Sequence, residues 1–182
     1  SADRLPRYKG NKDESIDAVC KGHRRKTMTA DERFMKEAIE LARLAAEHGN
    51  EPFGAVLVKD GEAVFTNENQ IYTESDPTFH AELGLIRRFC AQTKITDLSD
   101  YTLYSSCEPC FMCSGALVWM KLGRLVYGAS DMDLGEILHE QGSECSRMVF
   151  DNSPWKPQVT AGVLRDESYA LLKEYFLNHK KG

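Results

Sequence analysis

The segment between residues 101 and 129 places the strongest constraint on the fold, because it combines two strand patterns with a helix pattern between them. "YTLYSS" predicts a strand, "CFMCSGALVWMKLG" a helix opened by Pro109 and closed by Gly123, and "RLVYGA" a second strand. A strand, a helix and a strand at this spacing form a right-handed crossover between parallel strands. Upstream, "FGAVLVKDGEAVFTN" predicts an antiparallel hairpin that turns at Asp60-Gly61. We therefore expect an α/β fold with a mixed sheet.

Further elements are expected on both sides of this unit. "TADERFMKEAIELARLAAEHGN" predicts a helix, with Thr29 and Glu32 as a capping box and Gly49 as its stop. A second helix is predicted from about Thr78 to Ala91. Near the C-terminus, "QVTAGV" predicts a strand and "RDESYALLKEYFLNH" a closing helix. The pattern from Ser130 to Pro157 is mixed and assigns no element.

Length and composition favour a single globular domain. With 182 residues, of which 42% are hydrophobic, the chain can build one well-covered core and is short for two. We expect a domain over residues 29–182 and an extended arm, rich in charged residues, over residues 1–28.

The formal net charge of −5 argues against a broad nucleic-acid surface. Without an apolar run of membrane-spanning length or a secretory signal, we expect a cytoplasmic protein with six reduced cysteines.

The strongest chemical signal is the cysteine pair in "SCEPCFMCSGA". Cys110 and Cys113 lie at the start of the predicted helix, and three residues is nearly one helical turn, so both sulfurs face the same side. The N-terminus of a helix stabilises thiolates, which are the form of cysteine that binds metals. A metal site is therefore expected; a disulfide or a pair of buried structural cysteines is the alternative.

His80 and Glu82, in "TFHAELGLIRRFC", indicate what the cysteines bind. One histidine with two cysteines is a ligand set of catalytic zinc sites, and it leaves a fourth position for water. Because zinc lowers the pKa of bound water to about 7, a nearby carboxylate such as Glu82 can take up the proton. A structural zinc site would need a fourth protein ligand, which His23, Cys107 or Cys145 can in principle provide.

The residues "HAE" and "PCFMC" resemble the cytidine deaminase-like zinc hydrolases, whose signature joins His-x-Glu to Pro-Cys-x-x-Cys. The resemblance covers roughly residues 30–130. It implies a three-layer α/β/α sandwich with a central mixed sheet of about five strands. It also implies that water activated by zinc attacks the carbon that bears an exocyclic amine, with Glu82 as the catalytic proton carrier. The implied zinc ligands are His80, Cys110 and Cys113.

Within this superfamily the chain is similar to the purine branch, which contains guanine deaminases, plant guanosine deaminases and tRNA adenosine deaminases. In that branch the asparagine eleven residues before the zinc histidine binds the base, and this position is Asn69. "PFGAV" is similar to guanine deaminases, whose phenylalanine walls the base pocket, so Phe53 is expected to stack on the substrate. Backbone groups near Ala81 are expected to read the base. "YSSCEPCFMCSGALVW" is also similar to guanine deaminases, including Trp119, which the resemblance implies contacts the substrate. Glu108 within this run is expected to position the loop.

One region departs from the guanine deaminase pattern. The small bacterial enzymes carry a Gly-Phe-Asp-Asp stretch downstream of the second cysteine, and its acid helps to hold guanine. This chain has "LHEQGSECSRMVFDNSPW" there, so Glu140, Glu144 or Asp151 is a candidate replacement. The last predicted strand and helix are instead similar to those of tRNA adenosine deaminases.

Three functions are consistent with these patterns. The first is zinc-dependent hydrolytic deamination of a free purine base or a related amino-heterocycle, with guanine as the leading substrate. The second is adenosine-to-inosine deamination in tRNA, and the third is a non-catalytic binding module stabilised by zinc. We expect a small-molecule substrate rather than a nucleic acid. A homodimer is expected, because related enzymes complete their pockets at a subunit interface and "FMCSGALVWM" is strongly apolar.

Overall fold

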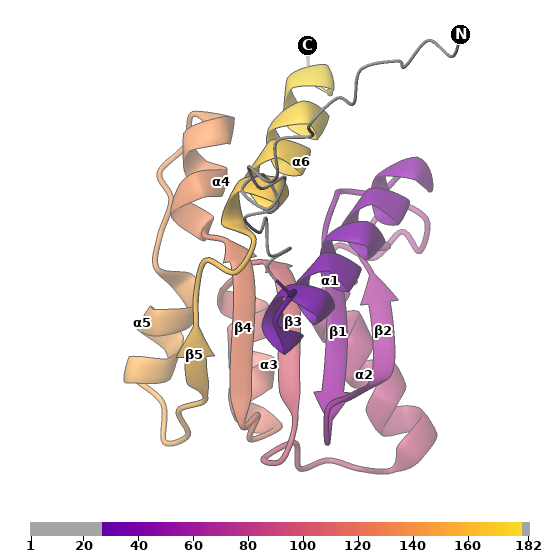
Figure 1. Ribbon diagram of the computed structural model, residues 1–182, viewed down its shortest axis with the longest axis vertical. Coiled ribbons are helices and arrows are strands. Elements are labelled where there is room, and N and C mark those ends of the chain that lie inside the picture. The colour runs from indigo at the N-terminus through magenta and orange to yellow at the C-terminus, as the bar shows by residue number, and fades with distance from the viewer. Residues whose placement is uncertain (1–26, 180–182) are drawn as a thin grey trace, which may run out of the picture.

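The computed structural model describes residues 27–179 and shows a mixed sheet flanked by helices (Figure 1). In chain order the elements are α1 (Ala30–Glu47), β1 (Gly54–Lys59), β2 (Glu62–Glu68), α2 (Ala81–Thr93), β3 (Thr102–Cys107), α3 (Phe111–Trp119), β4 (Arg124–Ala129), α4 (Asp131–Leu138), α5 (Cys145–Asp151), β5 (Gln158–Thr160) and α6 (Arg165–Asn178). The five strands lie in the order β2-β1-β3-β4-β5. β1 is antiparallel to β2 and β3, whereas β3, β4 and β5 are parallel. The predicted α/β class and mixed five-stranded sheet are confirmed.

The β1–β2 hairpin turns at Asp60-Gly61, as predicted. Both residues have positive φ, 51° for Asp60 and 77° for Gly61, which a tight primed turn requires. The pairing of the strands shifts between Leu57 and Val58, so a bulge interrupts the register in the middle of the hairpin. The Asp-Gly dipeptide fits this turn because aspartate tolerates positive φ and glycine has no side chain to oppose it.

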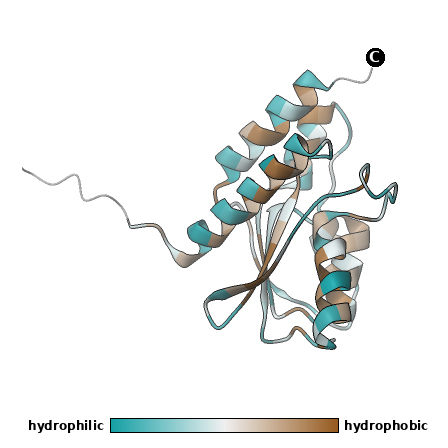
Figure 2. Cartoon of the chain, turned by 90° about the vertical axis from the view of Figure 1, so that its right-hand side faces the viewer, coloured by the Kyte–Doolittle hydropathy of each residue, from teal (hydrophilic) through white to brown (hydrophobic). Residues whose placement is uncertain are grey.

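Helices cover both faces of the sheet and give the three layers that the resemblance implies (Figures 1 and 2). α2, α3 and α5 pack on one face, over inward-facing strand residues such as Leu57 and Leu103. α1 and α6 pack on the other face, over residues such as Val56 and Tyr104. Because successive residues of a strand point to opposite faces, a sheet covered on both sides needs strands that are apolar throughout. β1 meets this requirement with five buried residues in succession.

The boundaries of two helices that carry site residues differ from the prediction. The helix expected from Thr78 begins at Ala81, because an Asx turn occupies the preceding residues. The helix expected to close at Gly123 ends at Trp119, because Lys121 adopts a left-handed φ of 51°. The N-terminal capping box of α1 is confirmed, with Thr29 and Glu32 each bonded to the other's backbone N–H.

The region from Ser130 to Pro157 forms the short helices α4 and α5, which the sequence did not predict. α4 starts with a capping box, in which Ser130 and Asp133 bond to each other's backbone N–H. The strand predicted over residues 158–163 is also shorter than expected and ends at Thr160. α4, α5 and β5 all follow β4 in the chain, and β5 forms the edge strand beside it.

The helices in residues 27–179 are all too short or too polar to cross a membrane. Most of the predicted N-terminal arm, including His23, lies outside the described residues.

Candidate metal centre and active site

Two helix N-termini bring the predicted metal ligands together. His80 is the N-cap residue of α2 and Cys110 is the N-cap residue of α3, and neither side chain caps its own helix. Their side chains are therefore available to each other, and His80 Nδ1 lies 3.6 Å from Cys110 Sγ. Cys113 lies one turn into α3. The ligand atoms of all three residues lie within 4.8 Å of one another, the only such group among residues 27–179.

The size and the chemistry of this group fit a zinc ion. A tetrahedral zinc site with bonds of about 2.3 Å to sulfur and about 2.0 Å to nitrogen separates sulfur from nitrogen by about 3.5 Å. The separation of 3.6 Å between His80 and Cys110 matches this value. Cys113 is fully buried, whereas the other two side chains are partly exposed. Three protein ligands leave one side of the site open for water or substrate.

The charges of the three side chains are strongly coupled. A hydrogen bond from Cys113 lowers the pKa of Cys110 to about 4, against the opposing effect of burial, and His80 lowers it further. The same contact with Cys110, together with burial, raises the pKa of Cys113. The hydrogen bond to Cys110 also raises the pKa of His80. These contacts favour a thiolate at Cys110, and because zinc binds thiolates and neutral imidazole, binding of zinc releases protons from its ligands.

Glu82 lies beside this group without belonging to it. It is the second residue of α2 and only 6% exposed, and its Oε1 atom accepts a hydrogen bond from Ser105 Oγ at 2.8 Å. Burial raises the pKa of Glu82, and the negative charge of Cys110 raises it further. A buried carboxyl group that gains a proton easily, next to a metal centre, suits a proton carrier better than a metal ligand.

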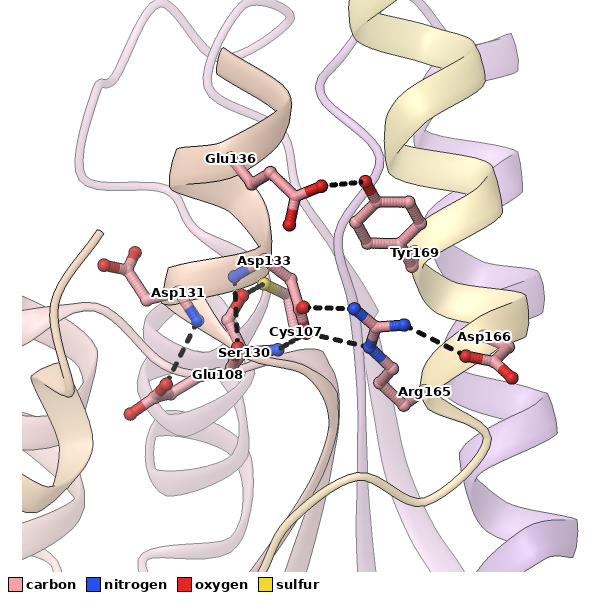
Figure 3. Close-up of polar contacts among 9 residues, drawn as sticks. All are labelled: Cys107, Glu108, Ser130, Asp131, Asp133, Glu136, Arg165, Asp166 and Tyr169. Atoms are coloured by element: carbon pink, nitrogen blue, oxygen red, sulfur yellow. Dashed lines mark hydrogen bonds and ion pairs between the residues drawn. The ribbon is translucent and has the colours of Figure 1, made fainter. Parts of the chain in front are cut away.

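Cys107, one of the possible fourth ligands, does not belong to the group. Its Sγ atom lies 3.9 Å from the carbonyl oxygen of Ser130, and burial raises its pKa well above the usual value for a thiol (Figure 3). Cys145 is also absent from the ligand group. Among the described residues, the structure therefore offers three protein ligands and no fourth.

Glu108 joins the metal-binding loop, residues 108–110, to both short helices; Figure 3 shows its contact with Asp131 at the start of α4. Its carboxylate accepts hydrogen bonds from Asp131 N at 3.1 Å, at the start of α4, and from Ser146 N at 3.1 Å and Ser146 Oγ at 2.6 Å, in α5. The side chain is 7% exposed, so these donors replace water. Because Glu108 is two residues before Cys110, the segment 131–151 is fixed directly against the metal-binding loop. This geometry supports the predicted positioning role.

The predicted base-binding residues lie in different environments. Asn69 is 1% exposed; its Oδ1 atom accepts from Ile71 N at 3.1 Å, and its Nδ2 atom is buried without a hydrogen-bond partner. Ala81 is fully buried, and its carbonyl oxygen accepts a hydrogen bond from Asn67. Phe53 is half-buried between two parts of the core. A buried amide donor with no partner is the feature expected of a group that awaits a ligand.

Trp119 is the last residue of α3, whereas Cys110 lies just before its first residue. The side chain of Trp119 is 86% exposed. The contact of Trp119 with a substrate therefore stays a prediction.

The three acids proposed to replace the missing motif do not form one site. Glu144 and Asp151 both pair with Arg147, at 3.2 and 3.5 Å, on the surface of α5. They line a groove of about 380 Å³ that contains Glu108 but none of the three zinc-ligand candidates. Glu140 is exposed, in the loop between α4 and α5. Their contact with a substrate also stays a prediction.

Two buried polar residues near the site were not identified from the sequence. Ser105 contacts Glu82, as described above. Asn50 fixes the loop that follows Asn69, because its Oδ1 atom accepts from Tyr72 N at 3.0 Å and Thr73 N at 3.1 Å. The available signal was weak: Ser105 is a polar residue at a core-facing position of a strand, and Asn50 follows a helix-ending glycine.

Comparison with known proteins agrees with this site. The family model described as the cytidine and deoxycytidylate deaminase zinc-binding region matches residues 28–129. The chain is 42% identical to the guanine deaminase of Bacillus subtilis over 106 residues, which cover 58% of this chain and 68% of that enzyme. It is 36% identical to the tRNA-specific adenosine deaminase of B. subtilis over 154 residues, which cover 85% of this chain and 93% of that enzyme.

Two further comparisons concern a longer protein and a solved structure. The chain is 38% identical over 143 residues to a tRNA(Ile)-lysidine synthase of Deinococcus radiodurans, of which it spans 24%. The structure of a guanine deaminase from Nitrosomonas europaea superposes with a TM-score of 0.70 at 28% identity, covering 79% of this chain and 83% of that one. With the matched family model and the geometry of His80, Cys110 and Cys113, the chain belongs to the cytidine and deoxycytidylate deaminase family of zinc-dependent aminohydrolases.

Proposed function

We propose that this protein hydrolytically deaminates a purine, with free guanine as the leading substrate. One observation supports this proposal most strongly. His80, Cys110 and Cys113 form one ligand group, and the buried carboxyl group of Glu82 lies beside it. A zinc ion held by these three residues would activate water for attack on the ring carbon that bears the amine. Glu82 would take a proton from the attacking water and pass it to the amine, which leaves as ammonia. The second proton of the water ends on a ring nitrogen, and the carbon keeps the oxygen as a carbonyl.

Two side chains would hold the base, Asn69 through a hydrogen bond and Phe53 through stacking. The buried Nδ2 atom of Asn69 offers a hydrogen bond to a ring nitrogen or carbonyl oxygen of the base. An incorrect ring would leave this donor unpaired, at a cost of about 1–3 kcal/mol. Phe53 would stack on the ring.

A tRNA adenosine deaminase is the second candidate, and one observation favours it. The tRNA-specific relative is matched over 93% of its length, compared with 68% for the guanine deaminase. The net charge of −5 weighs in the other direction, because binding to an anticodon loop needs basic contacts to phosphates.

A second copy of the chain is part of the proposal. Phe111, Met112 and Trp119 on α3 are 50%, 36% and 86% exposed, which is unusual for large apolar side chains on one helix. A homodimer would cover this face, and Trp119 would then lie at the subunit interface.

The test is ammonia release from guanine, guanosine, adenine, cytosine and a related aminotriazine, with inosine formation in tRNA measured in parallel. The variant Glu82→Gln is expected to bind zinc normally and to lose turnover, because it cannot accept the proton. Glu74→Gln is the matched control, since Glu74 is exposed on the loop that precedes α2. If none of the bases and no tRNA is deaminated, the non-catalytic zinc module is the better description. Loss of zinc in Glu82→Gln would contradict the assigned role of Glu82.

A further inference from the structure

Ser105 is a buried polar residue in the site that the reaction described above does not use. It lies on β3, is 2% exposed, and its hydroxyl oxygen lies 2.8 Å from Glu82 Oε1 and 2.7 Å from the carbonyl oxygen of Cys107. Leu103, two residues earlier on the same strand, belongs to the core beneath α2. Because alternate residues of a strand share a face, Ser105 points to the same side. Its hydroxyl therefore meets the first turn of α2 at Glu82.

Among the described residues, Ser105 provides the only side-chain hydrogen bond to the Glu82 carboxyl group. The glutamate side chain has three rotatable bonds, and the orientation of its terminal carboxyl group is weakly defined by its own torsions. A proton carrier must keep its oxygen within hydrogen-bond reach of the proton that it moves. The contact with Ser105 is the feature of the structure that satisfies this requirement.

The same hydroxyl group also contacts the backbone of its own strand. A serine hydroxyl has one hydrogen and can accept further hydrogen bonds. Its oxygen lies within hydrogen-bond distance of both Glu82 Oε1 and the carbonyl oxygen of Cys107, so it joins the Glu82 carboxyl group to the backbone at the end of β3.

We propose that Ser105 is a positioning residue, which holds the Glu82 carboxyl group in one orientation toward the metal centre. This inference rests on the proposed function, in which Glu82 carries the proton. It assigns Ser105 a role in the rate of the chemical step and none in holding zinc or in binding the base.

Ser106 provides a matched control on the same strand. It is also 2% exposed, and its hydroxyl oxygen accepts a hydrogen bond from Gly54 N at 3.0 Å, on the side of the sheet that α6 covers. Ser105→Ala and Ser106→Ala each remove one buried hydroxyl group together with its hydrogen bonds. They differ in whether the lost contact reaches Glu82.

The first test measures kcat, KM and zinc content of both zinc-loaded variants with whichever base is deaminated. Ser105→Ala is expected to lower kcat about 10- to 100-fold, as removal of supporting hydrogen bonds around metal sites does. Its KM and zinc content are expected to stay within about twofold of the original values. Ser106→Ala is expected to keep the original kcat. Equal kcat values in the two variants would overturn the proposal.

The second test does not depend on the substrate. Crystal structures of the zinc-loaded variants are expected to show the Glu82 carboxyl group rotated, or spread over several orientations, in Ser105→Ala and unchanged in Ser106→Ala. An unmoved Glu82 in Ser105→Ala would refute the positioning role, even if kcat falls. If the unaltered protein deaminates none of the compounds, the proposed function fails, and these structures still decide whether Ser105 orients Glu82.

Discussion

The Nδ1 atom of His80 lies 3.6 Å from the Sγ atom of Cys110, although 30 residues separate the two in the chain. Each residue is the N-cap of its helix, so the contact joins the N-termini of α2 and α3 near the end of β3. Both helices direct the positive ends of their dipoles toward this point, and the backbone N–H groups of Leu83 and Cys113 contact the sulfurs of Cys113 and Cys110. Such an environment favours the thiolate form of Cys110, whose pKa is lowered to about 4 by its contacts with Cys113 and His80.

Replacement of Cys113 by serine is expected to reduce the zinc content to well below one ion per chain, because a neutral hydroxyl group is a poor substitute for a thiolate ligand. Cys107→Ser is the matched control, since Cys107 is also buried near α3 but its Sγ atom lies against the carbonyl oxygen of Ser130. Elemental analysis after purification with excess zinc measures both. Zinc loss in Cys107→Ser with full retention in Cys113→Ser would restore Cys107 as the ligand.

The zinc ligands could be predicted because their spacing has a local physical meaning. Two cysteines three residues apart at the start of a helix must present their sulfurs on one side, whatever the rest of the chain does. The strand-helix-strand order around them fixed the parallel pairing of β3 and β4 in the same way. His80 was added through its ligand chemistry and the family resemblance, since nothing local connects it to residues 110–113.

The features that could not be predicted depend on contacts between distant residues. α4 has eight residues, and only Gly135 among them is fully buried, so its apolar pattern of Leu134 and Ile137 against the core is too short to identify a helix. Its start is also held through the backbone, by the Glu108 carboxylate at Asp131 N. The contact between Ser105 and Glu82 likewise crosses from a strand to a helix. Hydrogen bonds of this kind leave no periodic pattern in a sequence.

Replacement of Glu108 by alanine is expected to destabilise the protein by at least about 2 kcal/mol, because two backbone N–H groups and the Ser146 hydroxyl group lose their buried acceptor. Glu108→Gln keeps one acceptor oxygen and should lose less. Glu136→Ala is the control, since Glu136 accepts only a surface hydrogen bond, from Tyr169, and its loss should cost no more than about 0.5 kcal/mol. Urea unfolding measures the three variants. Equal stability of Glu108→Ala and Glu136→Ala would contradict the role of Glu108.

Gly54 and Gly115 are expected to respond oppositely to replacement by alanine. A Cβ atom on Gly54 would collide with the backbone of α1, including the carbonyl oxygen of Ala38 and, at 2.6 Å, the nitrogen of Ala42. Because backbone atoms of a packed helix cannot give way, Gly54→Ala should cost about 3 kcal/mol or more. A Cβ atom on Gly115 would meet nothing within 4 Å, so Gly115→Ala should gain about 0.5–1 kcal/mol from helix propensity. Thermal unfolding distinguishes them; a neutral Gly54→Ala would mean that α1 lies further from β1.

Asp31 is expected to make stability depend on pH. The Arg124 guanidinium donates two hydrogen bonds to Asp31, at 2.9 and 2.7 Å, and these lower the pKa of the carboxyl group against the opposing effect of burial. A carboxyl group whose pKa is lower in the folded state contributes stability above its unfolded pKa of about 3.9, and this contribution disappears as the pH falls through the folded pKa.

The variant Asp31→Asn should therefore be less stable than the original protein by about 1 kcal/mol at pH 7, the size expected for a partly exposed ion pair. The difference should stay constant down to about pH 5 and shrink below about pH 4, where the original protein also loses the charge. Asp60→Asn is the control, because asparagine suits the hairpin turn equally well and should change stability little at any pH. Urea unfolding at several pH values measures this difference in unfolding free energy. If the difference grows toward low pH, Arg124 does not stabilise the ionised form of Asp31.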